Sequence, residues 1–367
     1  MTRLVALVAS AIAATALAGC TTTTQASGPT DTSRPGGPAG NFVPDPTYRV
    51  SSDLLALGAA GREIAASCTK GICIWDATSG SLTRTIPGPS LLGASPDGAT
   101  FATLAPTPGP VRLGDSYPVR IRLFTAATGS TIHEVDGHRS TAVTDVPLGR
   151  GSAVAFSPNG SLVATSGDDA TVRVWAVADG SLKRQLATGG TTRSLAWSPD
   201  STRLATAGST VPLVVWDIEQ GTPIKPAPAS GTEALPARGI AWSPEGQRLA
   251  VTSAGPGGSV RILDATTQAV VATHPRPGVG FGVAFQPGGS LVAFSSPDSR
   301  TVVLWDPATS TSRELAGHTK APGAVAFSPD GASLFSVSTD DGIWRWDVAT
   351  GQRSTQFELP PKFGQSS

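Results

Sequence analysis

The sequence predicts an all-β fold built from repeated units of four antiparallel strands. Three marks recur from about residue 50 onward: an apolar strand before a Ser-Pro-Asp-Gly type of turn, a strand ending in Trp-Asp, and a turn that glycine usually closes. Successive units are 41 residues apart where nothing is inserted, as from Trp175 to Trp216. A fixed period of this length indicates a repeat architecture.

The Trp-Asp mark, or a remnant of it, identifies the third strand of seven units. The seven copies are ICIWD (72–76), IRLFT (121–125), VRVWA (172–176), LVVWD (213–217), VRILD (260–264), VVLWD (302–306) and WRWDV (344–348). The turn before every copy but the first, LALGAAG (55–61), contains a proline, which presets φ, followed mostly by Asp, Asn or Glu and then Gly, as in SPDG. Each unit therefore predicts strands a, b, c and d joined by short turns.

Four antiparallel strands in each repeat are the pattern of a β-propeller blade. A blade is apolar on both faces and buries them only against its neighbours, so the copies must pack into a closed ring. Over residues 50–358 the chain resembles the WD-repeat family, and the resemblance implies a seven-bladed β-propeller. The sequence leaves open whether residues 353–359 or an N-terminal segment provide the last outer strand.

The resemblance also implies a hydrogen-bond network within the blades, formed by a histidine, a Ser or Thr, an Asp and the tryptophan. Two units match this pattern, and we interpret their side chains as structural rather than catalytic. The matching residues are His138, Thr165, Asp169 and Trp175, and His318, Ser336, Asp340 and Trp346.

The N-terminus predicts export and lipid attachment. Residues 1–19 contain one arginine and an apolar run too short for a typical membrane span. Leu17-Ala18-Gly19-Cys20 resembles the lipobox of bacterial lipoproteins, which implies that Cys20 is lipidated and anchors the protein to the cell membrane, facing outside the cytoplasm. Ordinary cleavage after Ala18 is the alternative. We expect residues 20–49 to form a flexible tether and 359–367 a disordered tail.

Composition argues against one class of function, nucleic-acid binding. With Cys20 assigned to lipid attachment, Cys68 and Cys73 remain as a pair. Lys+Arg and Asp+Glu are both 27, which argues against a nucleic-acid binder. Cys68 and Cys73 flank a predicted hairpin turn, where they either form a disulfide or remain free thiols packed as small apolar groups. The sequence near them offers no further metal ligands, and we expect no metal site and no cofactor.

The sequence lacks the G-x-S-x-G and H-E-x-x-H signatures of hydrolases and metalloproteases. By analogy with WD-repeat domains, we expect a monomeric, non-catalytic platform for a protein or peptide at the cell envelope. The alternative is a propeller enzyme or a small-ligand or metal binder, similar to lactonases, that uses channel or rim loops. The small apolar strands predicted to line the channel, such as AVAF and GIAW, count against it.

Two insertions in adjacent units predict where a partner binds. From turn to marker, residues 95–124 span 29 positions where 157–175 span 18, and we place the excess in the b–c loop at 105–118. A second excess falls in the following d–a loop at 138–151. Both loops lie on one face, so we expect a shared rim; drift without function is the alternative. The candidate residues are Arg112, Leu113, Asp115, Tyr117, Arg139, Asp145 and Arg150.

Overall fold

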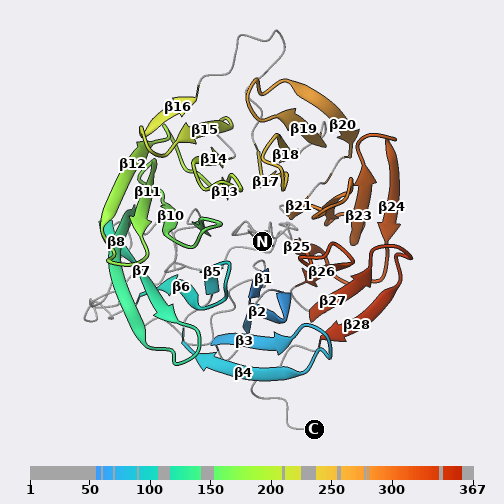
Figure 1. Cartoon of the computed structure of the whole chain (residues 1–367), viewed down its shortest axis with the longest axis horizontal. Coiled ribbons are helices and arrows are strands. Elements are labelled where there is room, and N and C mark those ends of the chain that lie inside the picture. Colours follow the sequence, from blue (N-terminus) through green and yellow to red (C-terminus); the bar gives the residue numbers. More distant parts are fainter. Residues whose placement is uncertain are drawn as a thin grey trace, which may run out of the picture.

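The protein is a ring of seven four-stranded antiparallel sheets, as predicted (Figure 1). The computed structural model describes residues 55–58, 61–68, 71–88, 91–105, 116–141, 153–208, 211–224, 237–253, 258–276, 278, 280, 282–338 and 342–357. The segments predicted as signal peptide, lipidated tether and C-terminal tail lie outside these residues. Within them, no helix is long and apolar enough to cross a membrane.

Each blade uses four strands that are consecutive in the chain. Blades 1 to 4 comprise β1 (Leu55–Gly58), β2 (Glu63–Cys68), β3 (Gly71–Asp76), β4 (Leu82–Pro87); β5 (Leu91–Ala94), β6 (Thr100–Leu104), β7 (Ser116–Thr125), β8 (Thr131–Thr141); β9 (Val154–Phe156), β10 (Leu162–Ser166), β11 (Thr171–Ala176), β12 (Leu182–Ala187); and β13 (Ser194–Trp197), β14 (Arg203–Ala207), β15 (Val214–Asp217), β16 (Thr222–Ile224). Blades 5 to 7 comprise β17 (Gly239–Trp242), β18 (Arg248–Ser253), β19 (Ser259–Asp264), β20 (Val270–Pro275); β21 (Val283–Phe285), β22 (Val292–Ser296), β23 (Thr301–Asp306), β24 (Thr311–Leu315); and β25 (Pro322–Phe327), β26 (Ser333–Ser338), β27 (Gly342–Asp347), β28 (Arg353–Phe357).

The first strand of each blade lies at the centre of the ring and the fourth at its circumference (Figure 1). Blade 7 takes its outer strand β28 from residues 353–357, and blade 1 begins with its own β1. In the described part of the chain, packing rather than an exchanged strand therefore closes the ring, which answers the question that the sequence left open.

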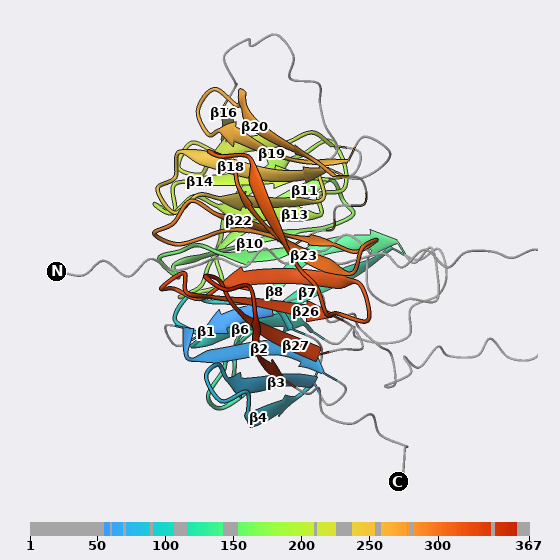
Figure 2. The ribbon, with the colours of Figure 1, turned by 90° about the vertical axis from the view of Figure 1, so that its right-hand side faces the viewer.

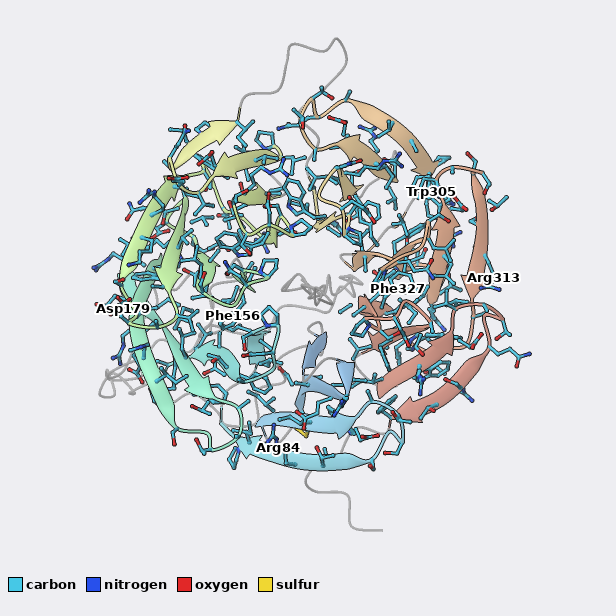
Figure 3. All side chains as sticks on the ribbon, viewed as in Figure 1. Arg84, Phe156, Asp179, Trp305, Arg313 and Phe327 are labelled. Atoms are coloured by element: carbon cyan, nitrogen blue, oxygen red, sulfur yellow. A yellow bond between two sulfur atoms is a disulfide. The ribbon has the colours of Figure 1, made fainter. Side chains whose placement is uncertain are left out.

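Seven apolar clusters fill the spaces between neighbouring blades, one at each junction. Trp197 and Trp242 end the first strands of blades 4 and 5, and each donates its indole N–H to a backbone oxygen of the preceding blade. Figure 3 shows Phe156 and Phe327 on the inner side of the ring, with Arg84, Asp179 and Arg313 on its outer circumference. The tryptophans and phenylalanines that mark the repeat thus join the blades.

The recurring turns are held by their own side chains. In the Ser-Pro-Asp turn of blade 4, Ser198 Oγ donates to Asp200 Oδ1 at 2.5 Å and accepts from the Arg203 N–H at 2.9 Å. In the Trp-Asp turn of blade 7, Asp347 Oδ1 accepts from the Thr350 N–H at 2.7 Å. These residue types recur because they satisfy backbone groups that a tight turn leaves without a partner.

Blade 2 differs from the predicted boundaries. Part of each insertion, expected in loops at 105–118 and 138–151, belongs to the two longest strands, β7 of 10 residues and β8 of 11. Antiparallel pairing continues to Ser116 opposite Thr141. The Ser116–Thr141 end of this strand pair, opposite its turn, projects beyond the neighbouring strands (Figure 2). The assignment of residues 116–118 and 138–141 to loops was therefore wrong, because each segment finds a pairing partner in the other.

Candidate binding rim between blades 2 and 3

The β7–β8 pairing brings the described ends of the two insertions, residues 116–118 and 139–141, side by side. Tyr117 lies opposite Ser140 and Pro118 opposite Arg139 in the register, and Arg139 is exposed. Of the predicted binding residues, Tyr117 and Arg139 thus belong to one hairpin. The other predicted binding residues, Arg112, Leu113, Asp115, Asp145 and Arg150, lie outside the described residues.

Ion pairs connect β7 and β8 between the hairpin turn and the projecting end. Arg120 Nη1 lies 3.0 Å from Glu134 Oε2, and Arg122 Nη2 lies 2.7 Å from Glu134 Oε1. The three side chains are each about 30% exposed, so solvent screens the attraction. Their main effect is to hold the register of a hairpin that extends away from the ring.

A buried histidine at this hairpin ties blade 2 to blade 3. His138 lies in β8, and its Nε2 is 2.9 Å from Thr165 Oγ1 on β10. The same hydroxyl oxygen accepts the indole N–H of Trp175 at 3.0 Å. His138 Nδ1 is 2.9 Å from Asp169 Oδ1. The structure therefore brings together the four side chains that the sequence grouped, and it places them across a junction between blades.

A neutral imidazole fits the contacts of this histidine. Thr165 accepts from Trp175 and can direct its own hydrogen at Nε2, while Nδ1–H donates to Asp169. This arrangement needs a neutral imidazole. Burial, the largest influence, lowers the pKa of His138, and it outweighs the opposing pull of Asp169. The buried ring contacts Thr165 and Asp169 through its two nitrogens, and so links blade 2 to blade 3.

Asp169 is the polar centre of the junction. Its carboxylate accepts from the Thr171 hydroxyl at 2.7 Å and from the Arg139 N–H at 3.4 Å, and it pairs with Arg173 at 3.3 Å. Burial raises the pKa of Asp169, but hydrogen bonds from Thr171 and His138 together outweigh it and lower the pKa. Arg173 also donates to the Gly137 carbonyl. The sequence analysis missed Arg173, although a charged residue inside an apolar strand c was visible.

The second predicted network lies between blades 6 and 7. His318 Nε2 is 2.7 Å from Ser336 Oγ, which also accepts the Trp346 indole N–H at 2.8 Å. The His318 ring stacks on Trp344 at 4.4 Å between centroids. Asp340 lies outside the described residues. The histidine, hydroxyl and tryptophan thus repeat the arrangement of blade 3.

The sequence analysis missed two further polar contacts, one within blade 4 and one between blades 5 and 6. In blade 4, Thr206 Oγ1 accepts the Trp216 indole N–H at 2.9 Å. Between blades 5 and 6, Arg276 donates from Nε to Ser296 at 3.1 Å and from Nη2 to Ser299 at 2.9 Å, and it pairs with Glu314. The threonine ten residues before Trp216 was a visible signal, whereas Arg276 has no counterpart in the repeat.

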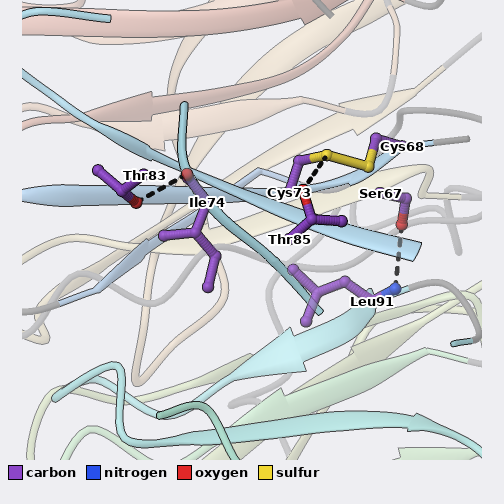
Figure 4. Close-up of a disulfide and its surroundings, with 7 residues drawn as sticks. All are labelled: Ser67, Cys68, Cys73, Ile74, Thr83, Thr85 and Leu91. Carbon is purple, nitrogen blue, oxygen red and sulfur yellow. Dashed lines mark hydrogen bonds between the residues drawn. A yellow bond between two sulfur atoms is a disulfide. The ribbon is translucent and has the colours of Figure 1, made fainter. Parts of the chain in front are cut away.

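Cys68 and Cys73 form a disulfide in blade 1, with their Cα atoms 5.8 Å apart (Figure 4). The bond links the end of β2 to the middle of β3. Cys73 is fully buried, and Thr85 Oγ1 on β4 lies 3.7 Å from its sulfur. Of the two arrangements that the sequence left open, the structure contains the bonded one.

Among the described residues, no group of three or more His, Cys, Asp or Glu side chains is arranged to hold a metal ion. Cys20, the predicted lipidation site, lies outside these residues.

Comparison with known proteins supports the repeat assignment. Residues 129–176 and 309–347 match the WD domain, G-beta repeat family. Protein Mut11 of Chlamydomonas reinhardtii is 59% identical over 39 residues, which are 11% of this chain and 10% of that protein. Ribosome assembly protein 4 of Saccharomyces cerevisiae is 38% identical over 65 residues, 17% of this chain and 13% of that protein. The chain thus spans about an eighth or less of the length of these relatives. The two segments that match the WD domain family, 129–176 and 309–347, contain the described residues of both histidine networks.

Proposed function

We propose that this chain is a lipid-anchored, extracytoplasmic binding platform for a protein or peptide, without catalytic activity of its own. The WD-repeat segments and the seven-bladed ring support the class, because such propellers typically bind protein partners. The Leu17–Cys20 sequence supports the anchor. The disulfide in blade 1 agrees with an oxidising compartment.

The observation that carries the proposal is the projecting β7–β8 hairpin. Function on a repeat scaffold is concentrated where one unit departs from the others, and this hairpin is the largest departure among the described strands. The contact of His138 with Asp169 attaches β8 to blade 3, and the Glu134 ion pairs connect β8 to β7. Paired ends of two insertions on a firmly held strand pair suit recognition of a partner surface.

The test is crosslinking of the membrane-anchored protein in its own cells, followed by purification and identification of the bound proteins. In one variant a Gly-Ser linker replaces residues 106–115, which leaves the Ser116–Thr141 pairing intact. In the matched control the same linker replaces residues 225–236, between β16 and β17. We expect one protein to be captured by the wild type and the control but lost from the 106–115 variant.

Equal capture by all three forms would show that the rim is not the binding site. If none of the forms captures a specific protein, the platform proposal itself is wrong.

A further inference from the structure

The disulfide of blade 1 lies at the junction that closes the ring. Side chains alternate along β2 and β3, and those of Ala66, Cys68 and Cys73 face blade 7. Ala65 and Ile72, on the other face, pack toward blade 2. The opposite side of the closing junction is formed by Ala324, Ala326, Phe335, Val337, Ile343 and Phe357.

This junction depends on side-chain packing. Blades 1 and 7 each use four consecutive strands, so no exchanged strand links them within the described residues. Blades 3, 4 and 7 carry a hydroxyl residue ten positions before the tryptophan, and that hydroxyl accepts its indole N–H. In blade 1, whose b–c turn is one residue shorter, the corresponding position in the strand register is Ala66, two residues after the Trp75 partner Ile64. Blade 1 thus lacks the hydrogen bond from hydroxyl to tryptophan. The Cys68–Cys73 disulfide lies on the same face, toward blade 7.

The two cysteines differ in exposure, which sets the order of attack by a reductant. Cys68 is partly exposed, whereas Cys73 is 0% exposed. A thiolate of a dithiol reductant reaches Cys68 Sγ first, forms a mixed disulfide with it and displaces the Cys73 thiolate, which takes up a proton. The second thiol of the reductant then displaces Cys68 as a thiol. The protein disulfide is reduced to two thiols, and the dithiol is oxidised to its own disulfide.

Reduction changes the packing at the junction. Two sulfurs that are no longer bonded must move apart, and Cys73 has closely packed apolar neighbours on the blade 7 side. Adding volume to a filled core forces its side chains and strands to shift. Ser67, the neighbour of Cys68, accepts the Leu91 N–H of blade 2 at 3.0 Å, so a shift of this hairpin also reaches the next blade.

We infer that Cys68–Cys73 is a redox-sensitive latch on the closed ring. Oxidation fixes the face of blade 1 against blade 7, and reduction by a dithiol loosens that junction. The inference concerns the ring itself and does not depend on which partner binds at the rim.

The test is hydrogen–deuterium exchange of the full chain before and after treatment with dithiothreitol, with the thiol state confirmed by alkylation and mass. We expect reduction to speed exchange about tenfold in β1, β2 and β25–β28, and less than about twofold in β13–β15. The double variant Cys68→Ala and Cys73→Ala is the control, because its exchange should not respond to dithiothreitol.

Three results would overturn the latch. The disulfide could resist dithiothreitol in the folded protein, which would make it a permanent crosslink. Reduction could change exchange only within the β2–β3 hairpin, which would make the bond a local one. Exchange could also rise equally in every blade, which would mean that reduction destabilises the whole domain. Reduction of the wild type decides among these results even if the double variant fails to fold.

Discussion

The indole N–H of Trp197 in blade 4 donates a hydrogen bond to the backbone oxygen of Ala155 in blade 3, with 2.9 Å between nitrogen and oxygen. Trp242 makes the same bond to Ala196 one blade further along. The first strands of three successive blades are therefore linked in series near the centre of the ring. The tryptophans provide both the apolar surface and the directional contact between blades.

Replacing Trp197 by Phe should therefore destabilise the domain beyond the loss of apolar surface. The Ala155 oxygen would lose its indole donor, and a typical intramolecular hydrogen bond contributes about 0.5–1.5 kcal/mol. We expect the urea midpoint of unfolding to fall with little change in its slope. Phe156 occupies the corresponding position of blade 3, so the ring tolerates a phenylalanine there. An unchanged midpoint would mean that the bond contributes no stability.

The buried His138 should make stability depend on pH. Burial lowers the pKa of His138 from its ordinary value of 6.5, so the folded protein keeps it neutral where the unfolded chain takes up a proton. Its contribution is complete above pH 6.5 and is lost as the pH falls toward the lower pKa of the folded state. We expect the free energy of unfolding to fall between pH 7 and pH 5.

The replacement His138→Gln separates this effect from other titrating groups. The variant should be less stable at pH 7 and show a shallower loss toward pH 5, since His274, whose pKa burial also lowers, remains in both proteins. Parallel pH profiles for the wild type and the variant would rule out His138 as a source of the pH dependence.

Thr165 and Thr206 offer a matched pair of substitutions. The Thr165 hydroxyl contacts two side chains, Trp175 and His138. The Thr206 hydroxyl accepts from the indole of Trp216, and its other contact is a long hydrogen bond of 3.4 Å to the Val214 backbone oxygen. Thr165→Val should therefore cost about 2–4 kcal/mol and Thr206→Val about 1–2 kcal/mol, because each buried polar group left without its partner adds its own penalty. Chemical denaturation of the two variants measures the difference, and equal costs would mean that His138 gains nothing from Thr165.

The predicted lipid anchor has a direct test. Replacing Cys20 by Ala removes the thiol that lipid attachment requires, so we expect the protein to leave the membrane fraction and to lose incorporation of labelled fatty acid. Cys68→Ala serves as the comparison, since that cysteine is paired within the folded ring. Continued membrane association of the Cys20→Ala variant, without label, would mean that another segment binds the membrane.

The resemblance to WD-repeat units was sufficient to locate most of the buried polar network. His138, Thr165, Asp169 and Trp175 match the positions that the resemblance implies, and the structure brings them into contact. Arg276 could not be found in this way. It reaches Ser296 and Ser299 from the preceding blade and replaces the usual histidine by a longer side chain at a different position.

The sequence by itself determined the number of blades, the order of strands within each blade and the residues that join the blades. Each of these follows from local pattern: turn chemistry, the alternation of apolar residues and a repeated spacing. Only the tertiary structure decided how the ring closes, that Cys68 and Cys73 lie on the closing face, and that the blade 2 insertions continue as paired strands. These features depend on which distant segments meet, and a strand pairs or packs according to the neighbour that the whole ring places beside it.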